Sequence, residues 1–261
     1  MGEKVRPSKV LSKLRDDKPV VCTKHNLWDP RTIDIAGIAG FDCVWLCNEH
    51  VPIDWADIEN QIRAAKVHDM DSLVRISKGS YSDYIKPLEA DATGVMVPHI
   101  FTAEEARNVV KMTRFMPLGR RPIDGGNADG QYCMVPLTEY TAFANRERFV
   151  LIQIEDPEPL DQLDEICSVE GIDIVFFGPG DFSHAIGRVG DVGHPEVLEA
   201  RRKVLEACQR HGKWAGVPAS VDNVRQTLDE GFRFVAIGAD VVGLSLYYKD
   251  IRDRLEQLDI V

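Results

Sequence analysis

The sequence predicts an α/β protein, a single (β/α)8 TIM barrel domain over residues 1–261. Short apolar segments alternate with longer helical patterns eight times along the chain. Most of the apolar segments are continuous rather than alternating with polar residues, as expected for parallel strands covered on both faces. The length of 261 residues suits this fold, which typically needs about 250.

Eight apolar segments, rich in β-branched and aromatic residues, are expected to form the strands. In chain order they are residues 19–24 (PVVCTK), 41–47 (FDCVWLC), 71–77 (DSLVRIS), 93–98 (TGVMVP), 149–154 (FVLIQI), 172–177 (IDIVFF), 213–217 (KWAGV) and 233–237 (RFVAI).

Each predicted strand is followed by a helical pattern. The helices are expected at residues 29–39, 54–68, 81–89, 102–112, 157–168, 195–211, 221–230 and 241–258. Eight such units in one chain of this length favour a closed barrel over an open, doubly wound sheet. No GxGxxG or Walker sequence opens the first helix, which further weakens the alternative of a nucleotide-binding sheet.

One stretch breaks the alternation and is predicted to be a long loop, at about residues 115–148. It contains the sequence GRRP, with Arg121 as a candidate site residue, followed by DGGNADG. A connection this long inside a compact domain is usually functional, for example as a lid or an intersubunit loop. The alternative is a surface loop without a functional role.

Composition and charge narrow the classes of partner. The net charge of −11 argues against a nucleic acid or an anionic membrane as partner, because phosphate binding needs a basic surface. No apolar stretch is long enough to span a membrane, and the first residues do not resemble a secretion signal. The six cysteines show no CxxC pair or zinc spacing, so reduced thiols in a cytoplasmic protein are expected.

Polar residues follow or end most of the predicted strands. In a barrel of this kind the catalytic groups lie at the carboxyl ends of the strands, so residues far apart in sequence converge there. The residues expected at this mouth are Lys24, His25, Glu49, His50, Arg75, His99, Glu155 and Asp181.

Glu155 and Asp181 follow neighbouring strands. Two carboxylates there could share a divalent cation and leave positions for water and a chelating substrate. The alternative is that each carboxylate only caps the helix that follows it. The segment Gly178-Pro179-Gly180 lets the backbone approach closely, so its amides could bind a small carboxylate, although a simple turn explains it equally.

Two further side chains have properties suited to oxo-acid chemistry. Arg75 interrupts an apolar strand, and a buried arginine needs a partner, either a protein carboxylate or the oxygens of an oxo acid. His50 titrates near neutral pH and could transfer a proton, although a lone histidine is more often structural.

Several separated motifs resemble the HpcH/HpaI family, the class II pyruvate aldolases typified by 4-hydroxy-2-oxoheptanedioate aldolase. The resemblance runs from about residue 20 to the last helix. The segments that carry it are AGFD (39–42), EH (49–50), VR (74–75), VP (97–98), QIE (153–155), VEGID (169–173) and GPGDFS (178–183).

The resemblance implies a barrel of the phosphoenolpyruvate/pyruvate superfamily that reversibly cleaves a 4-hydroxy-2-oxo acid into pyruvate and an aldehyde through a metal-stabilised enolate. Glu155 and Asp181 would then bind Mg²⁺, Mn²⁺ or Co²⁺, and Arg75 would hold the enolate oxygen. His50 would take part in proton transfer. Gln153 and the backbone of Gly178, Pro179 and Gly180 would line the oxo-acid site.

Family members usually form hexamers, trimers of dimers, in which the last helix is exchanged between neighbours. The resemblance therefore implies a homo-oligomer that acts on a small-molecule oxo acid.

The chain departs from the family pattern in two places. Cys47 occupies the position, three residues before His50, where the family usually has an aspartate that orients the histidine. Either Glu49 or another group replaces that aspartate, or the base is different, or the activity is reduced. Lys24 and His25 also differ from the usual apolar residues, which suggests a different aldehyde half of the substrate.

Three alternatives remain open on the sequence. A neighbouring reaction of the same superfamily, such as an acyl-CoA lyase, a decarboxylase or a citrate synthase-like condensation, could use the same enolate. A Schiff-base aldolase could use Lys24 or Lys78, but the carboxylate pair would then have no purpose. A catalytically degraded oxo-acid-binding protein is supported only by Cys47.

Overall fold

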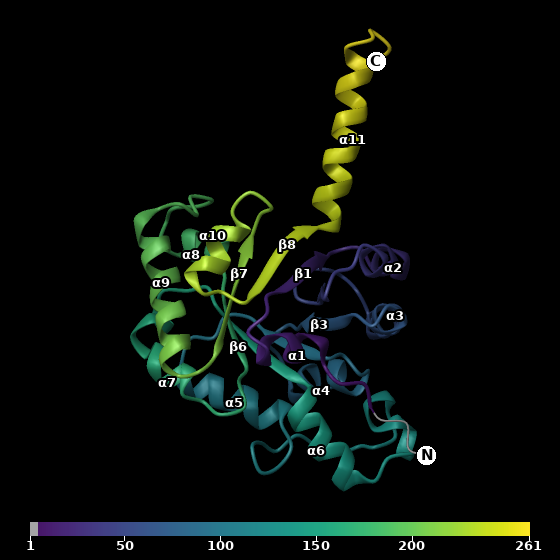
Figure 1. Ribbon diagram of the computed structural model, residues 1–261, viewed down its shortest axis with the longest axis vertical. Coiled ribbons are helices and arrows are strands. Elements are labelled where there is room, and N and C mark those ends of the chain that lie inside the picture. The colour runs from purple at the N-terminus through teal and green to yellow at the C-terminus, as the bar shows by residue number, and fades with distance from the viewer. Residues whose placement is uncertain (1–4) are drawn as a thin grey trace.

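Eight parallel strands close into a barrel in which each strand pairs with its neighbours in sequence and β1 pairs with β8 (Figure 1). The structure is a computed structural model that describes residues 5–261. The strands are β1 Val20–His25, β2 Cys43–Cys47, β3 Asp71–Arg75, β4 Gly94–Val97, β5 Phe149–Ile154, β6 Ile174–Phe177, β7 Trp214–Ala219 and β8 Phe234–Ala239. The predicted fold class, a (β/α)8 barrel, is confirmed.

Helices cover the outside of the barrel. They are α1 Lys9–Arg15, α2 Pro30–Ile38, α3 Trp55–Val67, α4 Tyr81–Glu89, α5 Ala103–Thr113, α6 Leu137–Glu147, α7 Leu163–Cys167, α8 Pro179–Ala185, α9 Pro195–Arg210, α10 Val224–Glu230 and α11 Asp240–Glu256, with 3₁₀ segments η1 Ala128–Cys133 and η2 Glu158–Gln162. The larger apolar core lies between these helices and the outward-facing strand residues such as Val44, Val95 and Val175.

A second apolar core fills the inside of the barrel. It contains the inward-facing residues of the strands, among them Trp45, Phe149 and Phe176, together with Leu11 and Leu14 of α1. Trp45 and Phe176 meet edge to face at 5.7 Å between ring centroids. The barrel is therefore a packed core rather than a pore, and α1 closes the end at which the strands begin.

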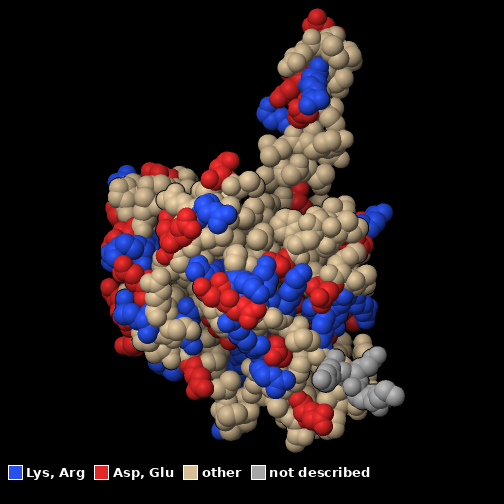
Figure 2. Space-filling model, viewed as in Figure 1, with Lys and Arg blue, Asp and Glu red and all other residues tan. Residues whose placement is uncertain are grey.

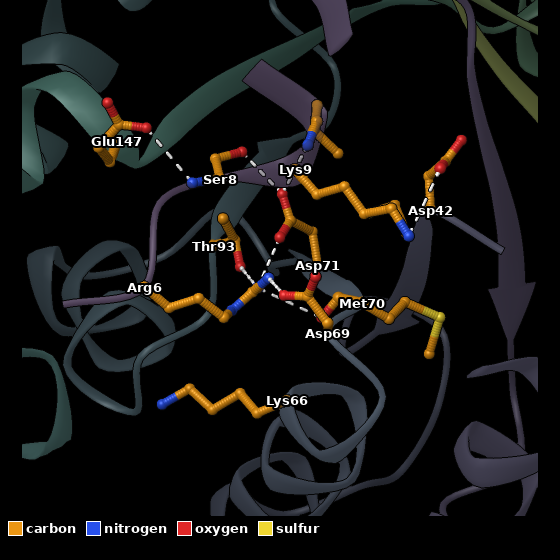
Figure 3. Close-up of polar contacts among 12 residues, drawn as sticks. Arg6, Ser8, Lys9, Asp42, Lys66, Asp69, Met70, Asp71, Thr93 and Glu147 are labelled. Atoms are coloured by element: carbon orange, nitrogen blue, oxygen red, sulfur yellow. Dashed lines mark hydrogen bonds and ion pairs between the residues drawn. The ribbon is translucent and has the colours of Figure 1, made fainter. Parts of the chain in front are cut away.

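Asp71, at the start of β3, anchors α1 to this closed end (Figure 3). Its side chain is fully buried. One of its oxygens accepts from Arg6 Nη2 at 2.5 Å, and the other accepts from Ser8 Oγ at 2.7 Å and from the Val10 amide at 2.9 Å. Ser8 is also the N-cap of α1 and accepts from the Leu11 amide, so the same contacts start the helix and hold it in place.

The predicted long loop at residues 115–148 is wrong in part, because its second half is the helix α6. Leu137, Tyr140 and Ala144 repeat at a helical spacing, and Tyr140 and Ala144 are buried against Phe115. The Gly-rich segment before them obscured this pattern. The short helices α1 and α8 were also not predicted.

The last helix, α11, projects away from the barrel (Figure 1). None of its residues is buried, and its apolar residues are exposed, including Leu246, Tyr247 and Tyr248 at 60–63%. Figure 2 shows few charged side chains on the part of this helix nearest the barrel and more of them towards its tip. Within residues 5–261 no helix has the length and apolar character required to cross a membrane.

Candidate active site

Strand alternation directs four polar side chains into the open end of the barrel. Trp45 and Leu73 face the interior core, so Cys47 and Arg75, two residues further along the same strands, face the same way. By the same alternation Lys24 follows Cys22 on β1, and Gln153 follows Leu151 on β5. These residues form the floor of a polar site above the apolar interior.

Arg75 lies at the centre of this floor and is 4% exposed. Its Nη2 donates to Cys47 Sγ at 3.1 Å, and its guanidinium carbon lies 4.7 Å from the centroid of the Trp45 ring. Its Nε lies 2.9 Å from Glu49 Oε2. The distance indicates an ion pair, but the atoms are not aligned for a hydrogen bond, and both remain without a hydrogen-bond partner. Arg75 therefore retains donor capacity for a ligand.

The Glu49 carboxylate lies close to three basic side chains. Besides Arg75, its Oε2 lies 3.1 Å from His50 Nε2, and its Oε1 lies 3.8 Å from His99 Nε2. His50 itself is 55% exposed at its side chain. The carboxylate next to His50 is thus that of Glu49, whereas Cys47 contacts Arg75 instead.

Glu155, just after β5, is a buried carboxylate that contacts mainly neutral donors. Oε1 accepts from the His99 amide and Oε2 accepts from Gln153 Nε2, both at 2.9 Å. Burial raises the pKa of Glu155 to about 7, even though the His99 contacts and the charge of Arg75 oppose this rise. The amide oxygen of Gln153, also buried, has no hydrogen-bond partner.

Asp181 lies in the first turn of α8 rather than at the end of a strand, and it is exposed. Its negative charge contributes to the raised pKa of Glu155, so the two carboxylates interact electrostatically. Gly178 precedes α8 and allows the chain to pass close to Glu155, because a Cβ at this position would lie 2.6 Å from Glu155 Oε2.

His99 belongs to this site, although the sequence assigned it no role. Its φ of +51° is unusual for a residue other than glycine, and its amide donates to Glu155 Oε1. Its Nδ1 lies 2.8 Å from Asp156 Oδ2. Burial lowers the pKa of His99, but the Asp156 hydrogen bond and the nearby carboxylates outweigh burial and raise it. The only sequence signal was its position after a strand.

The geometry can be compared with known proteins. The family model for the HpcH/HpaI aldolase/citrate lyase family matches residues 25–245. The chain belongs to this family. The match confirms the predicted family and the predicted enzyme class, a carbon–carbon lyase.

Individual relatives agree with this assignment. The 5-keto-4-deoxy-D-glucarate aldolase of Klebsiella pneumoniae is 31% identical over 242 residues, which cover 92% of this chain and 94% of that enzyme. The crystal structure of an HpcH/HpaI aldolase from Desulfitobacterium hafniense matches with a TM-score of 0.89 at 30% identity, over 94% of this chain and 96% of that one. A citrate synthase structure matches with a TM-score of 0.88 at 25% identity, over 98% and 99% of the two chains.

Two of the candidate site residues do not lie in the mouth of this HpcH/HpaI barrel. His25 faces outward from β1, because the adjacent Lys24 faces inward, and its Nδ1 lies 3.2 Å from Thr32 Oγ1 and 3.5 Å from Asp240 Oδ2. Burial lowers the pKa of His25, which favours the neutral ring.

Arg121 lies near the opposite end of the barrel, in the segment that leads through α6 to the start of β5. There it is buried and donates to Asp129 Oδ2 at 2.6 Å and to Tyr140 Oη at 3.2 Å. The sequence could not separate such a structural ion pair from a site residue, because both contain an arginine in a Gly-rich segment.

Proposed function

We propose that the protein is a metal-dependent class II aldolase that reversibly cleaves a 4-hydroxy-2-oxo acid into pyruvate and an aldehyde. The observation that carries the proposal is that a buried carboxylate and an incompletely bonded guanidinium, whose charges interact, both lie at the mouth of an HpcH/HpaI barrel. The carboxylate is Glu155 and the guanidinium is that of Arg75. The family relatives named as aldolases support the same reaction class.

The residues around Glu155 fit a divalent cation. The nearby His99 and Arg75 only partly compensate the burial that raises the pKa of Glu155 to about 7, and the unpartnered Gln153 oxygen beside it is a further hard ligand atom. Asp181 would add a second carboxylate, whose charge already acts on Glu155. Within residues 5–261 no cluster of three or more acidic, histidine or cysteine ligands occurs, so water and substrate would complete the coordination.

Glu155 and Asp181 would hold Mg²⁺, Mn²⁺ or Co²⁺, and the cation would supply positive charge opposite the C2 oxygen of the substrate. Arg75 would donate to the same oxygen with the N–H groups that the protein leaves free. Because Trp45 and Phe176 fill the barrel below the polar floor, the charge would develop close to a dry apolar interior, where each charged donor stabilises it more than in water.

Cleavage also requires a base for the proton of the C4 hydroxyl group. His50 is the exposed imidazole at the rim, and Glu49 lies close enough to orient it, at 3.1 Å. In this arrangement Glu49 would replace the aspartate that the family usually has at the position of Cys47.

We also propose that the protein forms a homo-oligomer, expected to be a hexamer built as a trimer of dimers. The exposed apolar residues of α11 support this, because a projecting helix with no buried residue has no reason to carry them unless another subunit covers them.

We also propose a cytoplasmic location. The six cysteines support it, because all of them are free thiols.

A citrate synthase-like condensation is the second candidate, favoured by the TM-score of 0.88 to a citrate synthase. It would use the same cation site and the same guanidinium, but its second reactant would be an oxo acid rather than an aldehyde. The two candidates differ in their products, so one assay separates them.

The test is pyruvate release from a series of 4-hydroxy-2-oxo acids of different length and charge, with Mn²⁺ and after chelation. We expect cleavage that chelation abolishes and metal restores, and that Arg75→Met reduces by at least about 100-fold. Metal-dependent condensation without cleavage would favour the second candidate. Neither cleavage nor proton exchange at the pyruvate methyl group would favour an oxo-acid-binding protein and contradict the proposal.

A further inference from the structure

Cys47 is a thiol at the open end of the barrel, in contact with a charged side chain. It is the last residue of β2, and its Sγ accepts from Arg75 Nη2 at 3.1 Å. Its exposed fraction is 4%, whereas the other buried cysteines have none, namely Cys22, Cys43, Cys167 and Cys208. A small solute in the mouth therefore reaches Cys47 more readily than the other four.

Arg75 has donor capacity that the protein does not use. The residue is 4% exposed, and its Nε has no hydrogen-bond partner, although Glu49 Oε2 lies 2.9 Å away. Sulfur is a weak acceptor, so the contact with Cys47 satisfies Nη2 only in part. An anionic oxygen bonded to this sulfur would be a stronger acceptor for the buried guanidinium than the sulfur itself.

Lys24 brings a second positive charge to the same place. Its Nζ lies 5.5 Å from the centroid of the Trp45 ring, and the Arg75 guanidinium carbon lies 4.7 Å from the same centroid. Across residues 5–261 the ammonium group forms neither a hydrogen bond nor an ion pair. Its charge interacts with that of Cys47. Negative charge that develops at Cys47 would therefore meet two cations, with the Glu49 carboxylate offsetting part of their effect.

We propose that Cys47 is a modification site for peroxides, at which hydrogen peroxide converts the thiol to a sulfenic acid whose oxygen binds Arg75. The sulfur attacks one peroxide oxygen, and the O–O bond breaks. The leaving hydroxide takes up the thiol proton and departs as water, so the sulfur loses two electrons and the peroxide gains them. Arg75 and Lys24 favour this step because they stabilise the leaving hydroxide and the anionic form of the product.

Oxidised Cys47 would compete with the oxo acid for Arg75. The proposed function assigns the free donors of Arg75 to the C2 oxygen of the substrate, so this consequence rests on that function. Cys43, four residues earlier on β2, is fully buried, and Trp45 stands between the two cysteines on the same face of the strand. We therefore expect an added thiol, not an internal disulfide, to reverse the oxidation.

The first measurement is the rate of modification at each cysteine. Metal-free protein in a chelator is treated with hydrogen peroxide, quenched with catalase and unfolded in dimedone, which labels sulfenic acids. Peptide mass spectrometry compares Cys47 with Cys133, an exposed thiol in η1 that serves as internal reference. We expect Cys47 to react at least about ten-fold faster than Cys133. Arg75→Met should remove most of this advantage and leave the rate at Cys133 unchanged.

The second measurement is pyruvate binding to the protein after the peroxide has been removed and Mn²⁺ added, by isothermal titration calorimetry. Oxidation should weaken binding to the wild type by about ten-fold, and dithiothreitol should restore it. Cys47→Ser keeps an acceptor for Arg75 but cannot form a sulfenic acid, so its loss should stay below about two-fold. Cys133→Ser is the matched control and should lose binding as the wild type does.

The modification and the proposed function can fail separately, because labelling needs neither metal nor oxo acid. A Cys47 that reacts no faster than Cys133, or an unchanged rate in folded Arg75→Met, would overturn the inference. If Arg75→Met does not fold, Lys24→Met tests the same effect of charge and should slow the reaction at Cys47 alone.

The binding data separate the remaining outcomes. Labelled wild type that binds pyruvate as tightly as before would overturn the competition between oxidised Cys47 and the oxo acid. Wild type that is labelled at Cys47 but binds no pyruvate even before oxidation would support the modification and contradict the proposed function alone.

Discussion

The buried carboxylate of Asp71 at the closed end and the polar residues of the open end differ in how far their hydrogen bonds are satisfied. At the closed end, both oxygens of Asp71 are hydrogen-bonded, to Arg6 on one side and to Ser8 and Val10 on the other (Figure 3). At the open end, Gln153 Oε1, Glu49 Oε2 and Arg75 Nε are buried without a hydrogen-bond partner. Towards the closed end Arg121 Nε, Asp129 Oδ1 and Arg148 Nε are also buried without such a partner. The contrast is therefore between the contacts of Asp71, which serve stability, and the open end, which keeps polar groups available for a ligand at a cost in stability.

The largest expected effect comes from breaking the closed end. Asp71→Ala should lower the free energy of unfolding by roughly 3 kcal/mol, because it leaves the buried donors of Ser8 and Val10 without this acceptor and removes a charged partner of Arg6. Urea denaturation measures this, with the exposed Asp16→Ala as control. Activity per folded molecule should stay the same. If Asp71→Ala reduced the activity per folded molecule as strongly as the substitutions at the open end do, the division between the two ends would be contradicted.

At the open end, Asp181→Asn should reduce activity and Mn²⁺ affinity by at least about 100-fold, because it removes one of the two carboxylate charges that face the cation. Since Asp181 is exposed, the free energy of unfolding of the metal-free protein should change little. Calorimetric titration of the protein with Mn²⁺ measures this affinity. An unchanged Mn²⁺ affinity would mean that Asp181 only occupies the first turn of α8 and does not hold the cation.

A third prediction concerns the pH dependence of stability. The pKa of Glu155 rises from 4.5 to about 7 on folding, so folding takes up a proton between these values. This group therefore favours the folded state fully below pH 4.5, and that advantage is lost as the pH rises through about 7. In Glu155→Gln the side chain cannot ionise, and Gln153 can rotate to offer its unpartnered oxygen to the new amide.

At pH 8 in the presence of a chelator, the free energy of unfolding of Glu155→Gln should therefore exceed that of the wild type by roughly 2 kcal/mol. The variant should nevertheless be inactive. The difference should shrink towards pH 5. Thermal denaturation at the two pH values measures it, and Gln153→Leu serves as the neighbouring control. A variant that is less stable than the wild type at pH 8 would show that the buried carboxylate is already compensated.

The smallest effect is expected at Cys47. In Cys47→Asp the new carboxylate would replace the sulfur 3.1 Å from Arg75 Nη2 and pair with the guanidinium. The KM for pyruvate in the condensation direction should rise a few-fold, with little change in kcat, because Glu49 already lies beside His50. Cys47→Ala removes the sulfur without adding charge and serves as control. A clear rise in kcat would mean instead that His50 lacks an orienting carboxylate.

The sequence predicted the barrel well because continuous apolar strands and helical spacing are local signals. The predicted ends of β5 and α4 agree with the structure, and the other shared elements differ by a few residues. The prediction failed where a local signal was weak. Gly-rich residues before α6 hid its apolar spacing, and α1 and α8 are only seven residues long.

The same distinction between local and non-local signals applies to the residues of the candidate site. Strand position brought Glu155, Arg75 and Gln153 to the mouth, because residues that end parallel strands converge. It could not distinguish Lys24, which faces inward, from His25, its outward-facing neighbour, until the register of β1 was known. Arg121, named only as a candidate in the long loop, lies near the closed end, because sequence position alone does not tell which end of the barrel a long connection covers.

By itself the sequence determined the eight β/α units, the family and the residues that end the inward-facing strands, since each of these depends on local spacing or on residue identity. Only the tertiary structure decided which charges face each other: Arg75 faces Cys47 and Glu49, His99 lies against Glu155, and Lys24 forms no ion pair with any of residues 5–261. The physical reason is that Coulomb and hydrogen-bond energies depend on distances across the barrel, between strands separated by tens of residues in the chain.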